Sequence, residues 1–310
     1  MENLIILSGT SNPELSKEIS QNLGVNLAEI SIERFADGEI NVKVLTNVRG
    51  KDVFLIQSTC PPVNDNLMEL LIVIDALRRA SAKRITAVIP YYGYARQDRK
   101  VEPRVPITAK LVANLLVAAG ANRVLSLELH AGQIQGFFDI PVDNLYSSVI
   151  FVEKFKTIKL EEPVVVSPDA GGVDRARALA KHLNADLALV DKRRPAPNKA
   201  KVFNIIGEVE GKNCLIYDDI VDTAGTATEV AKALHKNGAK RIFLLATHPV
   251  LSGDAQEKIE NSPLEKVIVT NSIPLKKASE KIEVLSVGKL FASAIERIHH
   301  ETSISDLFKL

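Results

Sequence analysis

Short, nearly continuous apolar runs alternate along this chain with longer segments whose apolar residues recur every three to four positions. The first pattern is typical of strands buried on both faces of a sheet, and the second is typical of amphipathic helices. The predicted strands are Leu4–Leu7, Val53–Gln57, Ile85–Ile89, Val124–Leu129, Val164–Val166, Leu187–Val190, Leu215–Tyr217, Ile242–Ala246 and Val267–Val269. The predicted helices are Leu67–Ala80, Ile107–Ala119, Val173–Leu183, Thr226–Lys236 and Lys289–Ile298. Such alternation predicts an α/β fold of mainly parallel sheets flanked by helices.

The length of 310 residues favours two domains. An internal repeat supports this division, because Ala76-Leu77 and the following 82–85 segment AKRI recur as Ala233-Leu234 and 239–242. We therefore expect an N-terminal domain over residues 1–150 and a C-terminal domain over residues 151–310. The C-terminal tail is expected to pack back on the first domain.

Composition excludes several classes of protein. Lys and Arg number 39 against 38 Asp and Glu, so a global polyanion partner such as nucleic acid is not expected. No apolar run reaches the ~18 residues of a membrane span, and no basic region precedes the apolar N-terminal stretch, so we expect neither a span nor a signal peptide. The two cysteines, Cys60 and Cys214, lie far apart, which favours a reducing cytoplasm over a disulfide scaffold.

An acidic pair, Asp218 and Asp219, ends a predicted strand, and the small residues of Asp222–Thr226 then lead into a predicted helix. Small residues at a helix N-terminus let backbone N–H groups approach a phosphate. The carboxylates cannot bind that phosphate, but they suit the hydroxyls of a neighbouring sugar or a cation. The plainer alternative is an acidic turn that caps the helix, a role that fits Asp222. Two adjacent acids at the end of a buried strand favour the sugar phosphate site.

A second turn, Ser167–Gly172, also follows a strand and precedes a helix, which contains Arg175 and Arg177. Its glycine pair predicts another phosphate cradle, and Asp169 is a candidate Mg²⁺ ligand because Mg²⁺ takes few carboxylates together with phosphate oxygens and water. His130 follows a strand at the edge where open α/β sheets bind ligands, although a histidine satisfied by hydrogen bonds is the common alternative.

Two segments are rich in basic residues. Residues 76–110 hold nine basic and two acidic side chains, and Tyr91–Arg104 adds tyrosines, a combination that fits a nucleotide polyphosphate. RNA binding and a solvated basic face are the alternatives. Asp191–Asn198 is basic and holds two prolines, so it predicts an exposed loop that swings over a bound polyphosphate. A charged connector is the alternative there.

Together these segments resemble the ribose-phosphate pyrophosphokinase family over nearly the whole chain. The motifs that carry the resemblance are RFADGE at 34–39, NVRG at 47–50, YYGYARQDRK at 91–100, ELHAGQIQGFF at 128–138, SPDAGG at 167–172, KRRPAPN at 192–198 and DDIVDTAGT at 218–226. The resemblance implies two phosphoribosyltransferase-like domains and a cytoplasmic homo-oligomer, usually a hexamer. It also implies transfer of the pyrophosphoryl group of ATP to the 1-hydroxyl of D-ribose 5-phosphate. The products would be 5-phospho-α-D-ribose 1-diphosphate (PRPP), used in nucleotide biosynthesis, and AMP.

The resemblance further implies roles for individual residues. Lys192 and Arg194 would lie on a mobile catalytic loop, and His130 and Asp169 would hold Mg²⁺. The expected ribose 5-phosphate ligands are Arg194, Asp218, Asp219, Asp222, Thr223, Ala224, Gly225 and Thr226. The expected ATP ligands are Arg96, Gln97 and Arg99, with Phe35, Asp37, Gly38 and Glu39 from a neighbouring subunit.

The C-terminal tail resembles a segment that this family uses at a subunit interface to bind ADP as an inhibitor and phosphate as an activator. The residues implied in this allosteric site are Arg49, Arg78, Lys100, Ser303, Ser305 and Phe308. A frayed terminus is the alternative. The sequence departs from the family pattern at two single residues and in one segment. Glu128 replaces a common Asp, Asp174 replaces a neutral residue, and the 101–105 segment VEPRV replaces an arginine-rich run.

Two other functions are compatible with parts of the pattern. A phosphoribosyltransferase that moves ribose 5-phosphate to a base would keep Asp222–Thr226 but would not need Arg96–Arg99 or the 34–39 motif. A non-catalytic regulatory or RNA-binding relative should have lost Lys192, Arg194 or the acidic pair, and all of these are present.

Overall fold

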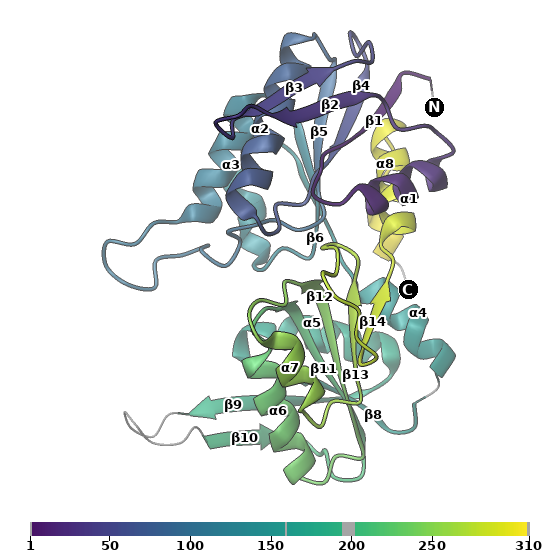
Figure 1. Cartoon of the computed structure of the whole chain (residues 1–310). Helices are drawn as coiled ribbons and strands as arrows, with labels where there is room; N and C mark the ends of the chain where they lie inside the picture. The colour runs from purple at the N-terminus through teal and green to yellow at the C-terminus, as the bar shows by residue number, and fades with distance from the viewer. Residues whose placement is uncertain (1, 159, 194–201, 309–310) are drawn as a thin grey trace. The chain divides into compact units, whose positions relative to one another are not determined.

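The computed structural model describes residues 2–158, 160–193 and 202–308, and the chain divides into two compact units (Figure 1). Among the described residues, unit 1 comprises 2–146, 272–274 and 286–308, and unit 2 comprises those within 147–271 and 275–285. The polypeptide therefore leaves unit 1, builds unit 2 and returns.

Unit 1 is built on a parallel sheet whose five described strands lie in the order β1-β4-β5-β6-β7. These strands are β1 (Leu4–Ser8), β4 (Asp52–Ile56), β5 (Arg84–Ile89), β6 (Arg123–Leu127) and β7 (Val142–Leu145). The helices are α1 (Pro13–Leu23), α2 (Val63–Arg79), α3 (Thr108–Ala119), α8 (Gly288–His299), η1 (Gly132–Phe137) and η3 (Ser305–Phe308). Helix α2 packs against α3, and α1 packs against α8. A separate antiparallel hairpin pairs β2 (Ile30–Arg34) with β3 (Ile40–Val44).

Unit 2 holds a larger sheet, whose described strands lie in the order β10-β9-β8-β11-β12-β13-β14. Their bounds are β8 (Pro163–Ser167), β9 (Asp186–Arg193), β10 (Val202–Ile206), β11 (Asn213–Val221), β12 (Arg241–Pro249), β13 (Lys266–Thr270) and β14 (Ile282–Leu285). The β9–β10 pair is antiparallel, and the other neighbouring strands are parallel. The helices are α4 (Ser148–Ile158), α5 (Val173–Leu183), α6 (Gly225–Lys236), α7 (Ala255–Glu260) and η2 (Ala170–Gly172).

The central strand β11 shows why the apolar runs in the sequence are continuous. Successive side chains of a strand point to opposite faces of the sheet. Cys214 and Ile216 pack in the cluster that includes residues of α6 and α7, whereas Leu215 and Tyr217 pack in the cluster that includes residues of α4 and α5. Both faces of the sheet are covered, so neither set of side chains is exposed to water.

The α/β class, with mainly parallel sheets flanked by helices, is confirmed. The prediction of a loop over Asp191–Asn198 is wrong for its first three residues, because β9 continues to Arg193. Asn204 lies opposite Asp191, Phe203 opposite Lys192 and Val202 opposite Arg193. Antiparallel pairing with β10 extends the strand beyond its apolar part. The rest of that segment lies outside the described residues.

Both cysteines are buried and neither forms a disulfide within the described structure; Cys60 lies in unit 1 and Cys214 in unit 2. None of the helices in the described ranges is both long and apolar enough to span a membrane.

Candidate active site

The acidic pair Asp218 and Asp219 lies near the carboxyl end of β11 and is paired with Arg175 of helix α5. Nη1 of Arg175 donates to Oδ1 of Asp219 over 3.0 Å and lies 3.6 Å from Oδ1 of Asp218. The Asp219 side chain is 5% exposed and that of Asp218 is 28% exposed. Oδ1 of Asp218 also accepts a hydrogen bond from the backbone N–H of Asp219 at 2.9 Å. Of the two carboxylates, Asp218 is therefore the one more open to a ligand.

The close pair changes the acidity of Asp218. Burial, the charge of Asp219 and a hydrogen bond with Asp219 raise the pKa of Asp218 to about 8, and the charge of Arg175 opposes this rise. Two like charges side by side disfavour the ionisation of both carboxyls. In the unliganded protein, this pair therefore holds on to a proton more strongly than isolated aspartates do.

The turn after β11 leads directly into helix α6. Ala224 takes the left-handed conformation with φ of 57°, and α6 starts at the next residue, Gly225. Thr223 and Thr226 are exposed, whereas Ala224 is buried. The first N–H groups of a helix have no partner within the helix and carry the positive end of its dipole. The predicted phosphate loop, Asp222–Thr226, thus stands at a helix N-terminus with its hydroxyl-bearing residues in solvent.

The second predicted turn lies beside the first, because β8 and β11 are parallel neighbours. Asp169 follows β8, and its Oδ1 accepts a hydrogen bond from the backbone N–H of Gly172 at 3.1 Å. Asp169 is exposed, and a Cβ on Gly172 would come within 3.0 Å of Oγ of Ser167. The glycine turn is therefore tight and presents the Asp169 carboxylate at this sheet edge, whereas its roles as a phosphate cradle and a Mg²⁺ site stay predictions.

In unit 1, the basic aromatic segment after β5 is anchored by its tyrosines. Tyr91 and Tyr92 are buried, and the hydroxyl of Tyr92 donates to the main-chain oxygen of Ala109 at 3.0 Å. Burial raises the pKa of the Tyr92 phenol. A Cβ on Gly93 would lie 2.5 Å from the main-chain oxygen of Thr59, so only glycine fits there. Tyr91 and Tyr92 therefore pack in the core and do not form an exposed aromatic surface for a nucleotide.

The predicted ATP-binding residues of this segment are exposed. Arg96, Gln97 and Arg99 lie at the surface, whereas Asp98 between them is buried. Oδ2 of Asp98 accepts a hydrogen bond from Nε2 of Gln133 at 2.9 Å. The buried aspartate fixes the segment, so its neighbours on either side project into solvent.

The RFADGE motif forms the tip of the β2–β3 hairpin. Phe35, Asp37, Gly38 and Glu39 are all exposed there, and the phenyl ring of Phe35 is left uncovered, with 55% of the residue accessible. The turn is closed by a hydrogen bond from the backbone N–H of Phe35 to the main-chain oxygen of Glu39 at 2.9 Å. Gly38 has φ of 95°, a value that favours glycine. The structure brings these four predicted residues together at one hairpin tip.

The structure describes only part of the remaining residues that are predicted to act in catalysis or to bind the metal. His130 is exposed and follows β6 in unit 1, whereas Asp169 belongs to unit 2. The backbone of Lys192 lies in β9, and Arg194 lies outside the described residues. Within the described ranges, no group of three or more His, Cys, Asp or Glu side chains is arranged to hold a metal ion.

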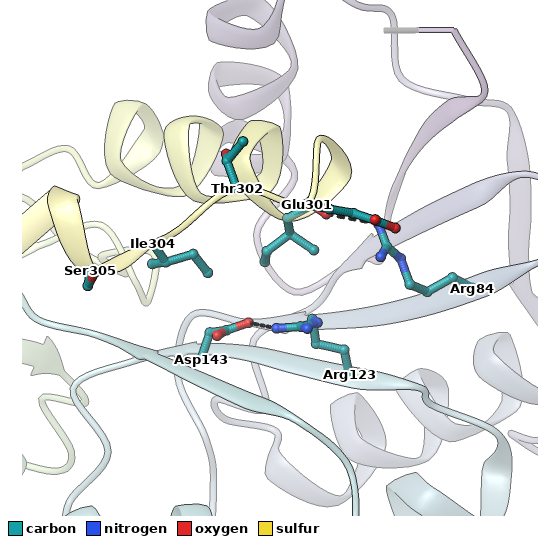
Figure 2. A pocket seen from close by; sticks show the side chains of 8 residues that line it. Arg84, Arg123, Asp143, Glu301, Thr302, Ile304 and Ser305 are labelled. Carbon is teal, nitrogen blue, oxygen red and sulfur yellow. Dashed lines mark hydrogen bonds and ion pairs between the residues drawn. The ribbon is translucent and has the colours of Figure 1, made fainter.

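The C-terminal tail borders a polar cavity of about 520 Å³ in unit 1 (Figure 2). Its lining residues are Arg84, Arg123, Asp143, Ile298, Glu301, Thr302, Ile304 and Ser305. Oγ atoms of Ser303 and Ser305 lie 2.7 Å apart, and the ring of Phe308 meets that of Tyr146 edge-on at 5.3 Å. Of the six predicted allosteric residues, Ser305 lines this cavity. Arg78 lines a separate cavity of about 310 Å³, and Arg49 and Lys100 are exposed elsewhere in the unit.

The sequence predicts a helix around Arg175 but does not pair this residue with the two acids. The available signal was helical spacing. Arg175 lies four residues before the buried Leu179 and therefore shares its face of α5. Arg177 instead pairs with Asp174 at the surface, at 2.7 Å.

Unit 2 has a parallel sheet covered by helices, and its paired carboxylates precede a turn of small residues at the start of a helix. These features are typical of phosphoribosyltransferase-like proteins. Two family models match the chain. The N-terminal domain of ribose phosphate pyrophosphokinase matches residues 4–120, and the phosphoribosyl synthetase-associated domain matches residues 188–309.

Whole-chain relatives agree with these matches. The chain is 56% identical over 303 residues to the ribose-phosphate pyrophosphokinase of Wolinella succinogenes, with 98% of each chain covered. It is 57% identical over 309 residues to that of Bacillus subtilis, covering 99% of this chain and 98% of the relative. The crystal structure of phosphoribosylpyrophosphate synthetase from Mycobacterium smegmatis matches with a TM-score of 0.92 at 41% identity, covering 97% of this chain and 100% of that one. The chain belongs to the ribose-phosphate pyrophosphokinase family, and its two domains are phosphoribosyltransferase-like.

Proposed function

We propose that this chain transfers the pyrophosphoryl group of ATP to the 1-hydroxyl of D-ribose 5-phosphate, giving PRPP and AMP for nucleotide biosynthesis. The observation that carries the proposal is the acidic pair Asp218 and Asp219 directly before the N-terminus of α6. It occurs in a chain aligned over 98% of its length with a relative named ribose-phosphate pyrophosphokinase.

On the acceptor side, the turn at Asp222–Thr226 binds the 5-phosphate of the sugar. Exposed hydroxyls of Thr223 and Thr226 and the N–H groups at the start of α6 suit an anion. Asp218 and Asp219 accept hydrogen bonds from the ribose hydroxyls once the proton held by the pair has been lost, since ionised carboxylates are acceptors only. This arrangement separates the phosphate from the carboxylates that would repel it.

On the donor side, Arg96, Gln97 and Arg99 bind ATP, together with Phe35, Asp37, Gly38 and Glu39 from a neighbouring subunit. The exposure of both sets in unit 1 supports this assignment, because a hairpin tip in solvent is accessible to another chain. Phe35 offers an apolar face for the adenine.

Charge on the polyphosphate has to be neutralised as the sugar oxygen attacks, so positioning and electrostatics dominate this chemistry. Lys192 and Arg194 stabilise the charge that develops between the β-phosphorus and the leaving AMP, an effect of ~3–5 kcal/mol. Mg²⁺ is proposed at His130 of unit 1 and at Asp169 of unit 2, where an exposed carboxylate oxygen suits a hard cation. When bound, the metal withdraws charge from the phosphate oxygens.

We further propose a cytoplasmic homo-oligomer, a hexamer, in which phosphate activates and ADP inhibits at a second site. Arg49, Arg78 and Lys100 supply positive charge to that site, and Ser303, Ser305 and Phe308 of the tail supply hydroxyls and an aromatic ring. The distribution of these residues over separate parts of unit 1 supports a site completed by adjoining chains.

The decisive experiment measures AMP release from ATP with Mg²⁺ and ribose 5-phosphate, with no nucleobase present. AMP and PRPP in equal amounts are the expected products. Nucleotide formation from PRPP and a base, without AMP release from ATP, would instead establish a phosphoribosyltransferase. RNA binding without consumption of ATP would establish a non-catalytic protein.

A further inference from the structure

Arg175 on helix α5 lies beside carboxylates from two segments of unit 2, the acidic pair on β11 and the turn that carries Asp169. Its Nη1 lies 3.0 Å from Oδ1 of Asp219 and 3.6 Å from Oδ1 of Asp218. A Cβ on Gly172 would lie 3.9 Å from this nitrogen and 3.8 Å from Oδ1 of Asp169. The guanidinium therefore faces the turn that carries Asp169 as well as the acidic pair on β11.

The burial of this group separates it from an ordinary surface ion pair. The Arg175 side chain is 16% exposed and that of Asp219 is 5% exposed. A carboxylate so little exposed needs a charged or hydrogen-bonding partner, because its desolvation is otherwise uncompensated. An Arg–carboxylate hydrogen bond is also directional, so it fixes the orientation of the carboxylate and not only its charge.

Two residues further along the same helix, Arg177 provides the contrast. Its Nη1 lies 2.7 Å from Oδ1 of Asp174, but the two side chains are 62% and 96% exposed. Such an exposed pair contributes little. The helix thus carries one arginine that faces the site and one that faces solvent.

We propose that Arg175 is a positioning residue for ribose 5-phosphate, which holds Asp219 in one orientation so that the pair presents Asp218 to the sugar hydroxyls. This inference rests on the proposed function. Without the guanidinium, the adjacent carboxylates repel each other, and Asp219 loses the partner that orients it. The hydroxyl-binding side chains then have to be ordered by the substrate itself, which weakens its binding.

The test compares Arg175→Gln with Arg175→Lys and with the matched control Arg177→Gln. Steady-state AMP release gives kcat and the KM for each substrate, and circular dichroism reports the fold. Arg175→Gln should raise the KM for ribose 5-phosphate by about 10-fold or more, as expected for loss of a charged hydrogen bond. The KM for ATP should stay within about twofold, because no ATP ligand is touched. Arg175→Lys should recover part of the loss, and Arg177→Gln should behave like the wild type.

A double variant shows whether Arg175 acts through Asp219. Arg175→Gln combined with Asp219→Asn should bind ribose 5-phosphate no worse than Asp219→Asn alone, since the partner is already lost. This comparison also replaces Arg175→Gln if that single variant does not fold, because the double variant removes both charges. A further rise in KM in the double variant would mean direct contact with substrate and would overturn the positioning role.

The inference also fails if folded Arg175→Gln keeps a wild-type KM for ribose 5-phosphate. Failure of the proposed function is a separate result, because the wild-type protein would then release no AMP under the same conditions.

Discussion

His299, in the last turn of α8, donates from Nδ1 to Oδ2 of Asp52 on β4 over 2.8 Å, although 247 positions separate them in the sequence. The same carboxylate accepts hydrogen bonds from Nε and Nη2 of Arg84 at 2.8 and 2.5 Å. Nη2 of Arg84 also donates to the main-chain oxygen of Ile298 at 3.0 Å. Asp52 is thus the shared acceptor through which strands β4 and β5 hold the end of the last helix.

Asp52→Asn should lower the free energy of unfolding by about 1–3 kcal/mol, because the neutral amide removes the charge that pairs with the partly buried Arg84 at 2.5 Å. Urea denaturation followed by circular dichroism measures the change. The control is Asp75→Asn, which breaks an Asp–Arg pair whose side chains are 46% and 79% exposed. The control should change stability by less than about 0.5 kcal/mol. Equal midpoints for the two variants would show that the Asp52 junction does not stabilise unit 1.

Lys192→Ala should reduce turnover at least ~100-fold, because the proposed role of this cation is realised only as charge develops in the transition state. The circular dichroism spectrum should stay that of the wild type. Lys240→Ala, a change at an exposed lysine of the same unit whose side chain is 59% exposed, is the control and should keep full activity. A Lys192→Ala enzyme with nearly normal kcat would contradict the proposed catalytic role of this residue.

A chain carrying Asp37→Ala and a chain carrying Arg96→Ala should each be nearly inactive, because each lacks one part of the proposed ATP site. If the hairpin tip serves a neighbouring subunit, mixed oligomers should regain part of the activity, since some sites then receive both intact parts. The measurement is AMP release after the two proteins are unfolded together and refolded. Mixed oligomers, verified with two affinity tags, that stay inactive would contradict the shared site.

Asp218→Asn should change how stability depends on pH in the absence of Mg²⁺ and substrate. The pKa of Asp218 is raised from 3.8 to about 8 in the folded chain, so between these values the folded state binds more protons than the unfolded state. The contribution of this group to stability is therefore fully present below the unfolded pKa and is lost as pH rises to the folded pKa. Asparagine does not titrate, so the Tm of the variant relative to wild type should rise between about pH 5 and about pH 9. A constant difference in Tm would contradict the raised pKa.

Deletion of residues 303–310 should weaken the part of ADP inhibition that saturating ATP does not remove. The deletion takes away the hydroxyls of Ser303 and Ser305 and the Phe308 ring that packs on Tyr146. Because the proposed second site lies between subunits, ADP there biases the assembly and does not only compete with ATP. Removal of residues 309–310 alone is the control. Purely competitive ADP inhibition in the intact protein would show that this second site does not bind ADP. The departure of the 101–105 segment from the arginine-rich run of the family would then be the explanation.

The buried strands of both sheets were predictable because two-sided burial leaves an uninterrupted apolar run, as in β4, where every residue is buried. The β2–β3 hairpin was missed because it is not buried in this way. Ile30 and Ile32 alternate with polar residues and are only half-buried. The continuation of β9 into Lys192 depends on pairing with β10, a contact that apolar periodicity does not record.

In the candidate site, too, local sequence patterns were predictable and features that depend on tertiary contacts were not. Acidic residues at a strand end and small residues before a helix are local patterns, so the sequence predicted the neighbourhood of Asp218 and Asp222. The roles of the two arginines on α5 depend on which face of the helix meets β11, and Arg175 was therefore not distinguished from Arg177. The burial of Tyr91 and Tyr92 likewise follows from packing around Gly93 that spacing alone does not show.

The return of the chain to unit 1 has a consequence during synthesis. Helix α1, which buries Leu15, Ile19 and Leu23, packs against α8, and α8 begins only at Gly288. The ribosome therefore synthesises the whole of residues 147–271 before it synthesises α8, the helix that packs on α1. Although domains made first commonly fold first, the first unit here waits for the last segment to be translated. A nascent chain arrested before Gly288 would carry α1 without the helix that it packs on, so unit 2 can complete its packing before unit 1 does.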